Sequence, residues 1–294
     1  AACLSLLPGG RGQAQQGQRL DVAGAFAITA SLMLAVYAIV NGNGAGWASM
    51  QTLALLGAAV ALLAVFLVIE SCVATPLVPL GLFRLHNLAI SNVIGVLWAA
   101  AMFAWFFVSA LYMQLVLGYS AMQVGLSFLP ANLIMAAFSL GLSAKMVMRW
   151  GIRLPLAAGL LLAAMGLALF ARAPVGGSFW LDVFPGMLLL GLGSGMALNP
   201  VLLAAMDDVG PAESGLASGV VNTAFMMGGA LGLAVLASLA DARTAALRTA
   251  GIDAVAALNG GYQLAFLLGA VFAAVATALG WWLRPVGAAS PDMH

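Results

Sequence analysis

The sequence predicts an all-α membrane protein with about eight transmembrane helices. Apolar residues make up 64% of the 294 residues and charged residues only 6%, whereas roughly 25% of an ordinary soluble domain is charged. The chain holds a single lysine, Lys145. Its apolar stretches are long, rich in Leu, Ala and Gly, and free of alternation with polar residues. This pattern indicates helices rather than the strands of a membrane barrel.

A helix needs about 20 mostly apolar residues to cross roughly 30 Å of hydrocarbon. Eight stretches meet this requirement: 22–41, 49–70, 87–112, 123–143, 154–172, 182–205, 215–239 and 261–283. Turn-forming or charged residues lie between them, and the longest predicted break is 240–260. Residues 1–21 form no span, because 1–7 is short and 8–19 is polar. We interpret them as the stub of an earlier helix and a cytoplasmic connector.

The positive-inside rule predicts the orientation. If residues 1–21 are cytoplasmic, seven of the ten basic residues fall on that side: Arg11, Arg19, Arg84, Lys145, Arg149, Arg153 and Arg284. Arg172, Arg243 and Arg248 then fall outside. We therefore expect both ends of the chain in the cytoplasm.

Neither nucleic-acid binding nor catalysis is expected. The net charge is only +1, and no basic face is present to neutralise phosphates. The sequence lacks a zinc-binding His-Glu-x-x-His helix, a Gly-x-Ser-x-Gly elbow and a phosphate-binding loop. The run Gly191-x-Gly193-x-Gly195 lies inside an apolar span, where small residues favour close helix contact over dinucleotide binding. We expect no enzyme and no cofactor.

Polar and aromatic side chains inside the spans are the candidate functional residues. In the third span, Trp98 and Trp105 share a helix face with small and polar residues that include Ser91 and Gly95. A polar group at membrane depth needs a partner or a water-filled cavity. The residues that we expect along a substrate path are Trp98, Trp105, Asn132, Asn199, Asn222 and Met226. The alternative for each is a role in helix packing.

The seventh span contains two small-x-x-x-small pairs, Gly215/Gly219 and Gly228/Gly232. Such pairs predict tight contact with a neighbouring helix. The alternative is a helix that slides or bends beside a substrate path.

Carboxylates are almost absent from the spans. Four lie near predicted edges: Asp21, Glu70, Asp182 and Asp241. Because a carboxylate at mid-bilayer is costly, we interpret all four as edge residues, and we expect no proton-carrying carboxylate in this chain.

Three segments carry a resemblance to a known family. Residues 111–130, LYMQLVLGYSAMQVGLSFLP, resemble the join between two helices in the fourteen-span drug:proton antiporters of the major facilitator superfamily. The stretch from Gly215 through Asn222-Thr223 to Gly229 resembles the penultimate helix of that group. Arg19-Leu-Asp21 resembles the entry into its extra central helix pair.

The resemblance implies a division of the chain. Residues 22–86 would be the central inserted pair, residues 87–294 the C-terminal six-helix bundle, and the N-terminal six-helix bundle would be missing. The family's proton-linked acid belongs to that missing bundle. A cytoplasmic latch loop would comprise Lys145, Arg149, Gly151 and Arg153, with Met148 in place of the usual acid.

The function expected from this resemblance is secondary active export across a bacterial inner membrane. The substrate would be an amphipathic or cationic small molecule, and the proton gradient would supply the energy. The expected partners are the substrate, protons, the lipid bilayer and the missing N-terminal bundle. The alternative is a non-transporting membrane scaffold or a truncated remnant.

Overall fold

The computed structural model describes residues 21–73, 76, 78, 80–210 and 213–284. Every regular element within these residues is helical, and eight helical segments among them are long and apolar enough to cross a membrane. The chain is therefore a multi-pass, all-α membrane protein, as its composition predicts. The stub and connector predicted for residues 1–20 lie outside the described residues.

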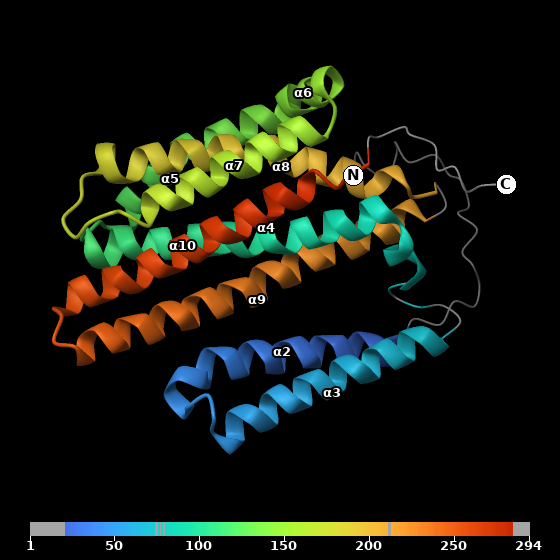
Figure 1. The fold of residues 1–294 in the computed structure, drawn as a ribbon, viewed down its shortest axis with the longest axis horizontal. Coiled ribbons are helices and arrows are strands. Elements are labelled where there is room, and N and C mark those ends of the chain that lie inside the picture. Colours follow the sequence, from blue (N-terminus) through green and yellow to red (C-terminus); the bar gives the residue numbers. More distant parts are fainter. Residues whose placement is uncertain (1–20, 74–75, 77, 79, 211–212, 285–294) are drawn as a thin grey trace, which may run out of the picture.

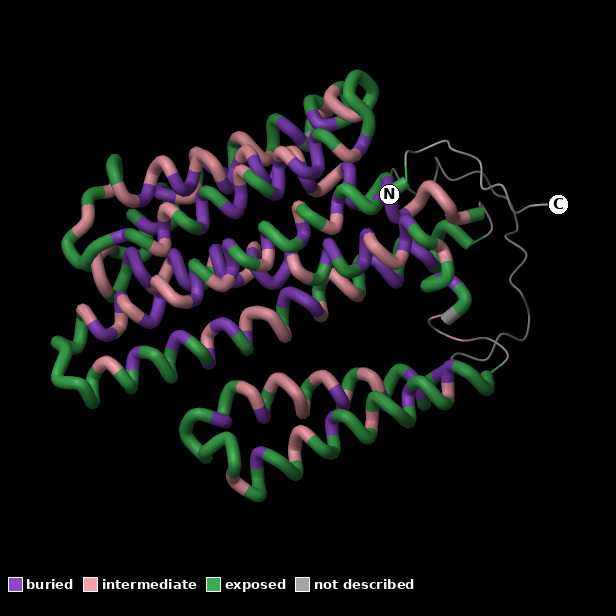
Figure 2. The backbone as a smooth tube through the Cα atoms, viewed as in Figure 1, coloured by how far each residue is buried: buried purple, intermediate pink, exposed green. Residues whose placement is uncertain are grey.

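Helices α2 (Val22–Ala45) and α3 (Met50–Cys72) form a hairpin that lies beside the other helices (Figure 1). Asp21 caps α2 by accepting a hydrogen bond at Oδ1 from the Gly24 N–H at 2.8 Å. Ser31 Oγ donates to the carbonyl of Ala59 at 2.7 Å and joins the two helices. Both helices are mostly exposed (Figure 2), because lipid would surround them, and α2 packs against α9.

The remaining spans form a bundle. Its elements are η1 (Leu80–Arg84), α4 (His86–Leu111), η2 (Tyr112–Val116), α5 (Ala121–Ala137), η3 (Phe138–Leu142), α6 (Ser143–Trp150), α7 (Arg153–Phe170), η4 (Phe179–Val183), α8 (Phe184–Asp207), α9 (Ser214–Thr249) and α10 (Ala254–Gly280). The largest contacts join α7 to α8 and α4 to α9, and α10 lies against α4, α7 and α9. The core includes the fully buried Trp105, Leu160, Phe170 and Met187. The division into an inserted pair and a C-terminal bundle stays a prediction.

Two residues within the segment 111–130 determine the shape of the turn between the third and fourth spans. Gly118 has a φ of +73°, a backbone conformation that other residues rarely adopt. Ser120 then begins α5 with a capping box, in which the Ser120 N–H donates to Gln123 Oε1 at 2.8 Å and Ser120 Oγ accepts from the Gln123 N–H. The segment therefore specifies a turn followed by a helix start.

Glycines set the closest approaches between helices. A Cβ atom on Gly193 would lie 2.5 Å from the carbonyl oxygen of Gly159, and one on Gly228 would lie 2.7 Å from the Cα of Val96. The tight contact predicted for Gly228/Gly232 and for the run around Gly193 is present. The same prediction is wrong for Gly215 and Gly219, because a Cβ on either would meet no atom within 4 Å among the described residues.

The predicted break at 240–260 is wrong. Helix α9 continues to Thr249 and α10 begins at Ala254, so the turn is only 250–253. Asp253 caps α10 by accepting from the N–H groups of Val255 and Ala256 at 3.0 and 3.3 Å. The error arose because charged residues mark the end of an apolar span, whereas an alanine-rich helix can continue past them.

The fourth span is also longer than predicted, since it continues to Trp150. Its irregularity lies at Phe138–Leu142, where Gly141 has a φ of +122°.

The carboxylate of Glu70 lies at the end of α3, as expected, but it is buried. Its Oε2 accepts a hydrogen bond from the Val78 N–H at 3.2 Å. Asp182 accepts from the Ser178 N–H at 2.7 Å and so stabilises the start of η4.

Candidate functional site

A cavity of about 270 Å³ lies between α4, α8 and α9. Its walls are formed by Ser91, Asn92, Gly95, Trp98, Leu198, Val201, Leu202, Val221, Asn222, Phe225 and Met226. None of these lining residues is charged. The cavity therefore combines apolar and aromatic walls with a few neutral hydrogen-bonding groups.

Three buried polar atoms on α4 belong to residues that line this cavity. They are Ser91 Oγ, Asn92 Oδ1 and Trp98 Nε1, and none has a hydrogen-bond partner among the described residues. The other end of the Asn92 amide is satisfied, because Nδ2 donates to the carbonyl of Leu88 at 2.8 Å. A buried polar group without a partner costs roughly 1–3 kcal/mol. A ligand or a water molecule in the cavity would remove that cost.

Three of the six predicted path residues meet at this cavity. Trp98 is 1% exposed and comes from α4, while Asn222 and Met226 come from one exposed face of α9. They meet because α4 packs closely against the glycines of α9. Their role in a substrate path stays a prediction.

The other three predicted residues lie elsewhere. Trp105 is fully buried against Phe106 and Phe128, with ring centroids 4.3 and 6.0 Å away. Asn132 is exposed on α5, and Asn199 is half-buried on α8. None of the three lines the cavity between α4, α8 and α9.

Asn92 is the cavity residue that the sequence analysis missed. It follows Ser91, so it falls outside the stripe of residues that share a face with Trp98. An amide inside a span, six residues after the helix begins at His86, was the signal that could have identified it.

A second polar cluster lies where α4 begins and holds the segment that follows α10. We call His86, Asn87 and Arg153 the α10 clasp. His86 Nε2 donates to the Trp282 carbonyl at 3.0 Å, and Arg153 Nε donates to the Leu283 carbonyl. Asn87 Oδ1 accepts from the Arg284 N–H at 2.8 Å. The clasp therefore joins α4, α7 and the end of α10.

The predicted latch loop contributes only Arg153 to this clasp. Lys145 and Arg149 are exposed, and the Arg149 guanidinium lies 5.4 Å from the centre of the Trp150 ring. Gly151 ends α6 with a φ of +72°, so its role in the loop is a turn. A latching function for these four residues stays a prediction.

We expect Asn87→Leu to destabilise the protein by roughly 1–3 kcal/mol, because the Arg284 N–H loses the acceptor that the fully buried Asn87 supplies while side-chain volume changes little. Equilibrium unfolding of the intact protein in mixed detergent micelles measures this change. The matched control is Asn41→Leu, because the Asn41 side chain is exposed and donates only within its own helix, to Tyr37. Equal unfolding curves for the two variants would contradict a stabilising clasp.

The cavity walls offer hydrogen bonds and apolar contact, which is chemistry suited to binding a small molecule. Among the described residues, no three His, Cys, Asp or Glu side chains lie close enough to hold a metal ion.

Comparison with known proteins identifies related sequences. The sequence profile of the Major Facilitator Superfamily matches residues 16–233. The Cephamycin export protein CmcT of Amycolatopsis lactamdurans is 32% identical over 228 residues, which cover 77% of this chain and 47% of that protein. The Puromycin resistance protein pur8 of Streptomyces alboniger is 32% identical over 276 residues, which cover 90% of this chain and 54% of that protein.

A third relative is the Tetracenomycin C resistance and export protein of Streptomyces glaucescens. It is 33% identical over 227 residues, which cover 76% of this chain and 41% of that protein. The chain thus spans about half the length of the curated relatives that it matches.

Proposed function

The chain belongs to the Major Facilitator Superfamily, and on that basis we propose that it forms part of a secondary transporter that exports small molecules. The observation that carries the proposal is the cavity between α4, α8 and α9, where three buried polar atoms have no partner among the described residues. Transporters of this kind bind substrate between two helix bundles and expose the site to each side in turn.

The proposed substrate is an amphipathic or cationic small molecule. The cavity supports this class because Trp98, Phe225 and Met226 offer aromatic and polarisable surface, while Asn92 and Asn222 offer hydrogen bonds. The names of the relatives, export proteins for cephamycin and tetracenomycin C among them, support the export of small molecules.

A second bundle would complete the site. The cavity of about 270 Å³ is slightly smaller than complete small-molecule pockets, which measure about 300–1,000 Å³. Asn132, Asn222 and Met226 are exposed on the described chain. We propose that six N-terminal helices cover this side and supply the acid that carries protons, since no carboxylate lines the cavity.

The proposed location is the inner membrane of a bacterium, with both ends of the chain in the cytoplasm. The distribution of basic residues supports this orientation. The start of α2 and the end of α10 lie toward the same end of the molecule (Figure 1), which is compatible with this orientation. In this orientation the α10 clasp faces the cytoplasm.

The test is export of ethidium from bacterial cells that lack their own efflux pumps. We expect cells that produce the intact protein to retain less ethidium than cells carrying the empty vector. A protonophore should remove the difference, because a proton-coupled exporter loses its energy source. Equal retention with and without the protein would contradict export and favour the scaffold. Export that survives the protonophore would contradict proton coupling.

A further inference from the structure

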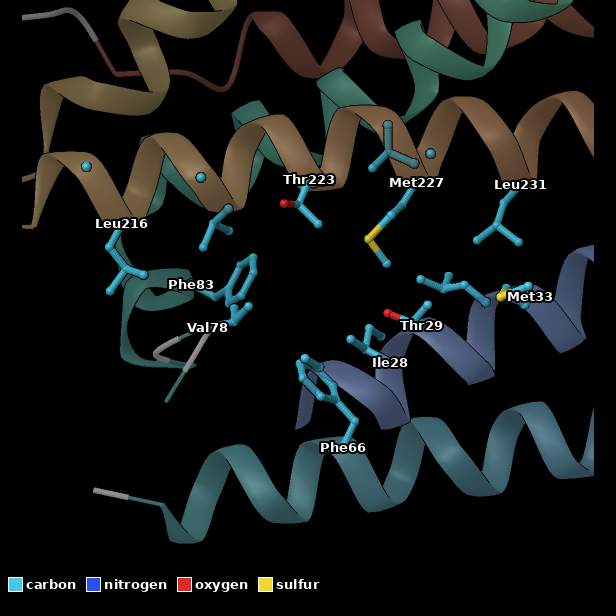
Figure 3. Close-up of a pocket in the computed structure, with 18 residues that line it drawn as sticks. Ile28, Thr29, Met33, Phe66, Val78, Phe83, Leu216, Thr223, Met227 and Leu231 are labelled. Carbon is cyan, nitrogen blue, oxygen red and sulfur yellow. The ribbon is translucent and has the colours of Figure 1, made fainter. Parts of the chain in front are cut away.

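A larger cavity of about 810 Å³ lies on another face of α9, between the α2–α3 hairpin and the bundle. Figure 3 shows its two principal walls: Ile28, Thr29 and Met33 on α2, and Leu216, Thr223, Met227 and Leu231 on α9. Phe66 of α3 and Phe83 of η1 reach toward the space between them. The smaller cavity uses different residues of α9, so the helix separates the two.

The lining of the larger cavity is almost wholly apolar. Among the 18 described residues that line it, only Thr29 and Thr223 have polar side chains, and none is charged. Gly215 and Gly219 widen it, because neither glycine has an atom of another residue where a Cβ would stand. A charged or strongly polar ligand would therefore enter this cavity without a partner, at considerable cost.

The cavity is extended along α2 and α9. Its lining extends from Gly215 to Leu231 on α9 and from Ala25 to Met33 on α2, which corresponds to about 24 Å and about 12 Å of helix. One leaflet of the hydrocarbon core is about 15 Å thick. The cavity therefore has the length of a lipid tail that lies along the helices.

The cavity is open at the surface of the described chain. Met33 and Leu216 line it and are 69% and 40% exposed. Water is disfavoured in so apolar a space. Lipid is the solvent here, so even weak affinity would keep the cavity filled.

The hairpin is fastened to the bundle beyond this cavity. Asn43 Nδ2 donates to the Ser238 carbonyl at 2.6 Å, and Asn43 Oδ1 accepts from Trp47 Nε1 at 2.8 Å. These contacts lie at the far end of α2. The cavity lies along the stretch of α2 from Ala25 to Met33.

We propose that the cavity binds one acyl chain of a membrane phospholipid, drawn from the leaflet on the side where α2 and α9 begin. The chain packs between the hairpin and α9 and completes their contact. This site is separate from the proposed substrate cavity, and its occupation does not depend on export.

The test is native mass spectrometry of the intact protein, purified in mild detergent from phospholipid nanodiscs. We expect one tightly retained phospholipid per protein. Gly219→Leu and Gly215→Leu should each lower that retention by about tenfold, because the new side chain occupies the space of the acyl chain. The matched control is Gly57→Leu on α3, which also has open space at its Cβ but does not line the cavity.

Two results would overturn the proposal. One is retention of no phospholipid by the wild-type protein, or equal retention by Gly219→Leu and Gly57→Leu. The other is displacement of the phospholipid by ethidium at equal concentration, which would identify the cavity as a site for soluble amphipathic cations. Gly215→Leu and Gly219→Leu each fill the cavity from a different position. If one of the two variants misfolds, the other still tests the proposal. Lipid retention is measured without transport, so failure here and failure of export remain distinguishable.

Discussion

Gly193→Leu is expected to prevent the bundle from assembling. A Cβ atom at this position would lie 2.5 Å from the Gly159 carbonyl oxygen and 2.7 Å from the Ala163 backbone nitrogen. Both are backbone atoms of α7, so no side chain can turn aside to make room. Helices α7 and α8 would have to separate, and these two form the most extensive contact in the bundle.

The expected destabilisation is about 3 kcal/mol or more, the upper part of the range for over-packed cores. Fluorescence-detected size-exclusion chromatography of the intact protein, before and after heating, measures the folded fraction. Gly57→Leu serves as the control, since leucine favours helix more than glycine does and meets open space there. A Gly193→Leu protein that elutes and melts like this control would show that α7 and α8 are not in contact through Gly193.

Gly95→Leu is expected to lower the rate of export about tenfold or more while the protein remains folded. A Cβ at Gly95 meets no described atom within 4 Å, yet the residue lines the cavity between α4, α8 and α9. The leucine side chain would therefore enter the cavity without displacing a helix. It would exclude substrate from the side chains of Trp98 and Asn222.

The rate of ethidium efflux from pre-loaded cells measures this effect, with the amount of folded protein determined in the same cells. Gly57→Leu again provides the comparison, because α3 does not contribute Gly57 to either cavity. Efflux at the wild-type rate from cells with normal amounts of Gly95→Leu would exclude this cavity from the substrate path.

The two glycine variants show why the sequence predicted some of the site and not all of it. Gly95 and Gly193 are both glycines inside apolar spans, and only the glycine run around Gly193 predicted a close helix contact. Gly95 borders an open cavity, whereas Gly193 lies against the backbone of α7. The difference depends on which helix lies opposite, and helical periodicity does not contain that information.

The predicted path residues fall into two groups, those that line the cavity and those that do not, for the same reason. Trp98 and Trp105 are seven residues apart on one face of α4, and both indole N–H groups lack partners among the described residues. Periodicity therefore treats them alike. Trp98 reaches the region where α4 meets α8 and α9, whereas Trp105 meets aromatic rings that include Phe128 of α5. The helix contacts at each level of the bundle decide which indole lines a cavity.

The sequence by itself determined that the described chain holds eight helices long and apolar enough to cross a membrane, because a backbone in hydrocarbon must satisfy its own hydrogen bonds and 64% of the side chains are apolar. Only the tertiary structure decided where α9 ends, which glycines touch a neighbour, and which polar atoms share a cavity. Those features depend on how far each helix is rotated and shifted against the next. Packing between helices sets that arrangement, because the composition of any single helix is compatible with several arrangements.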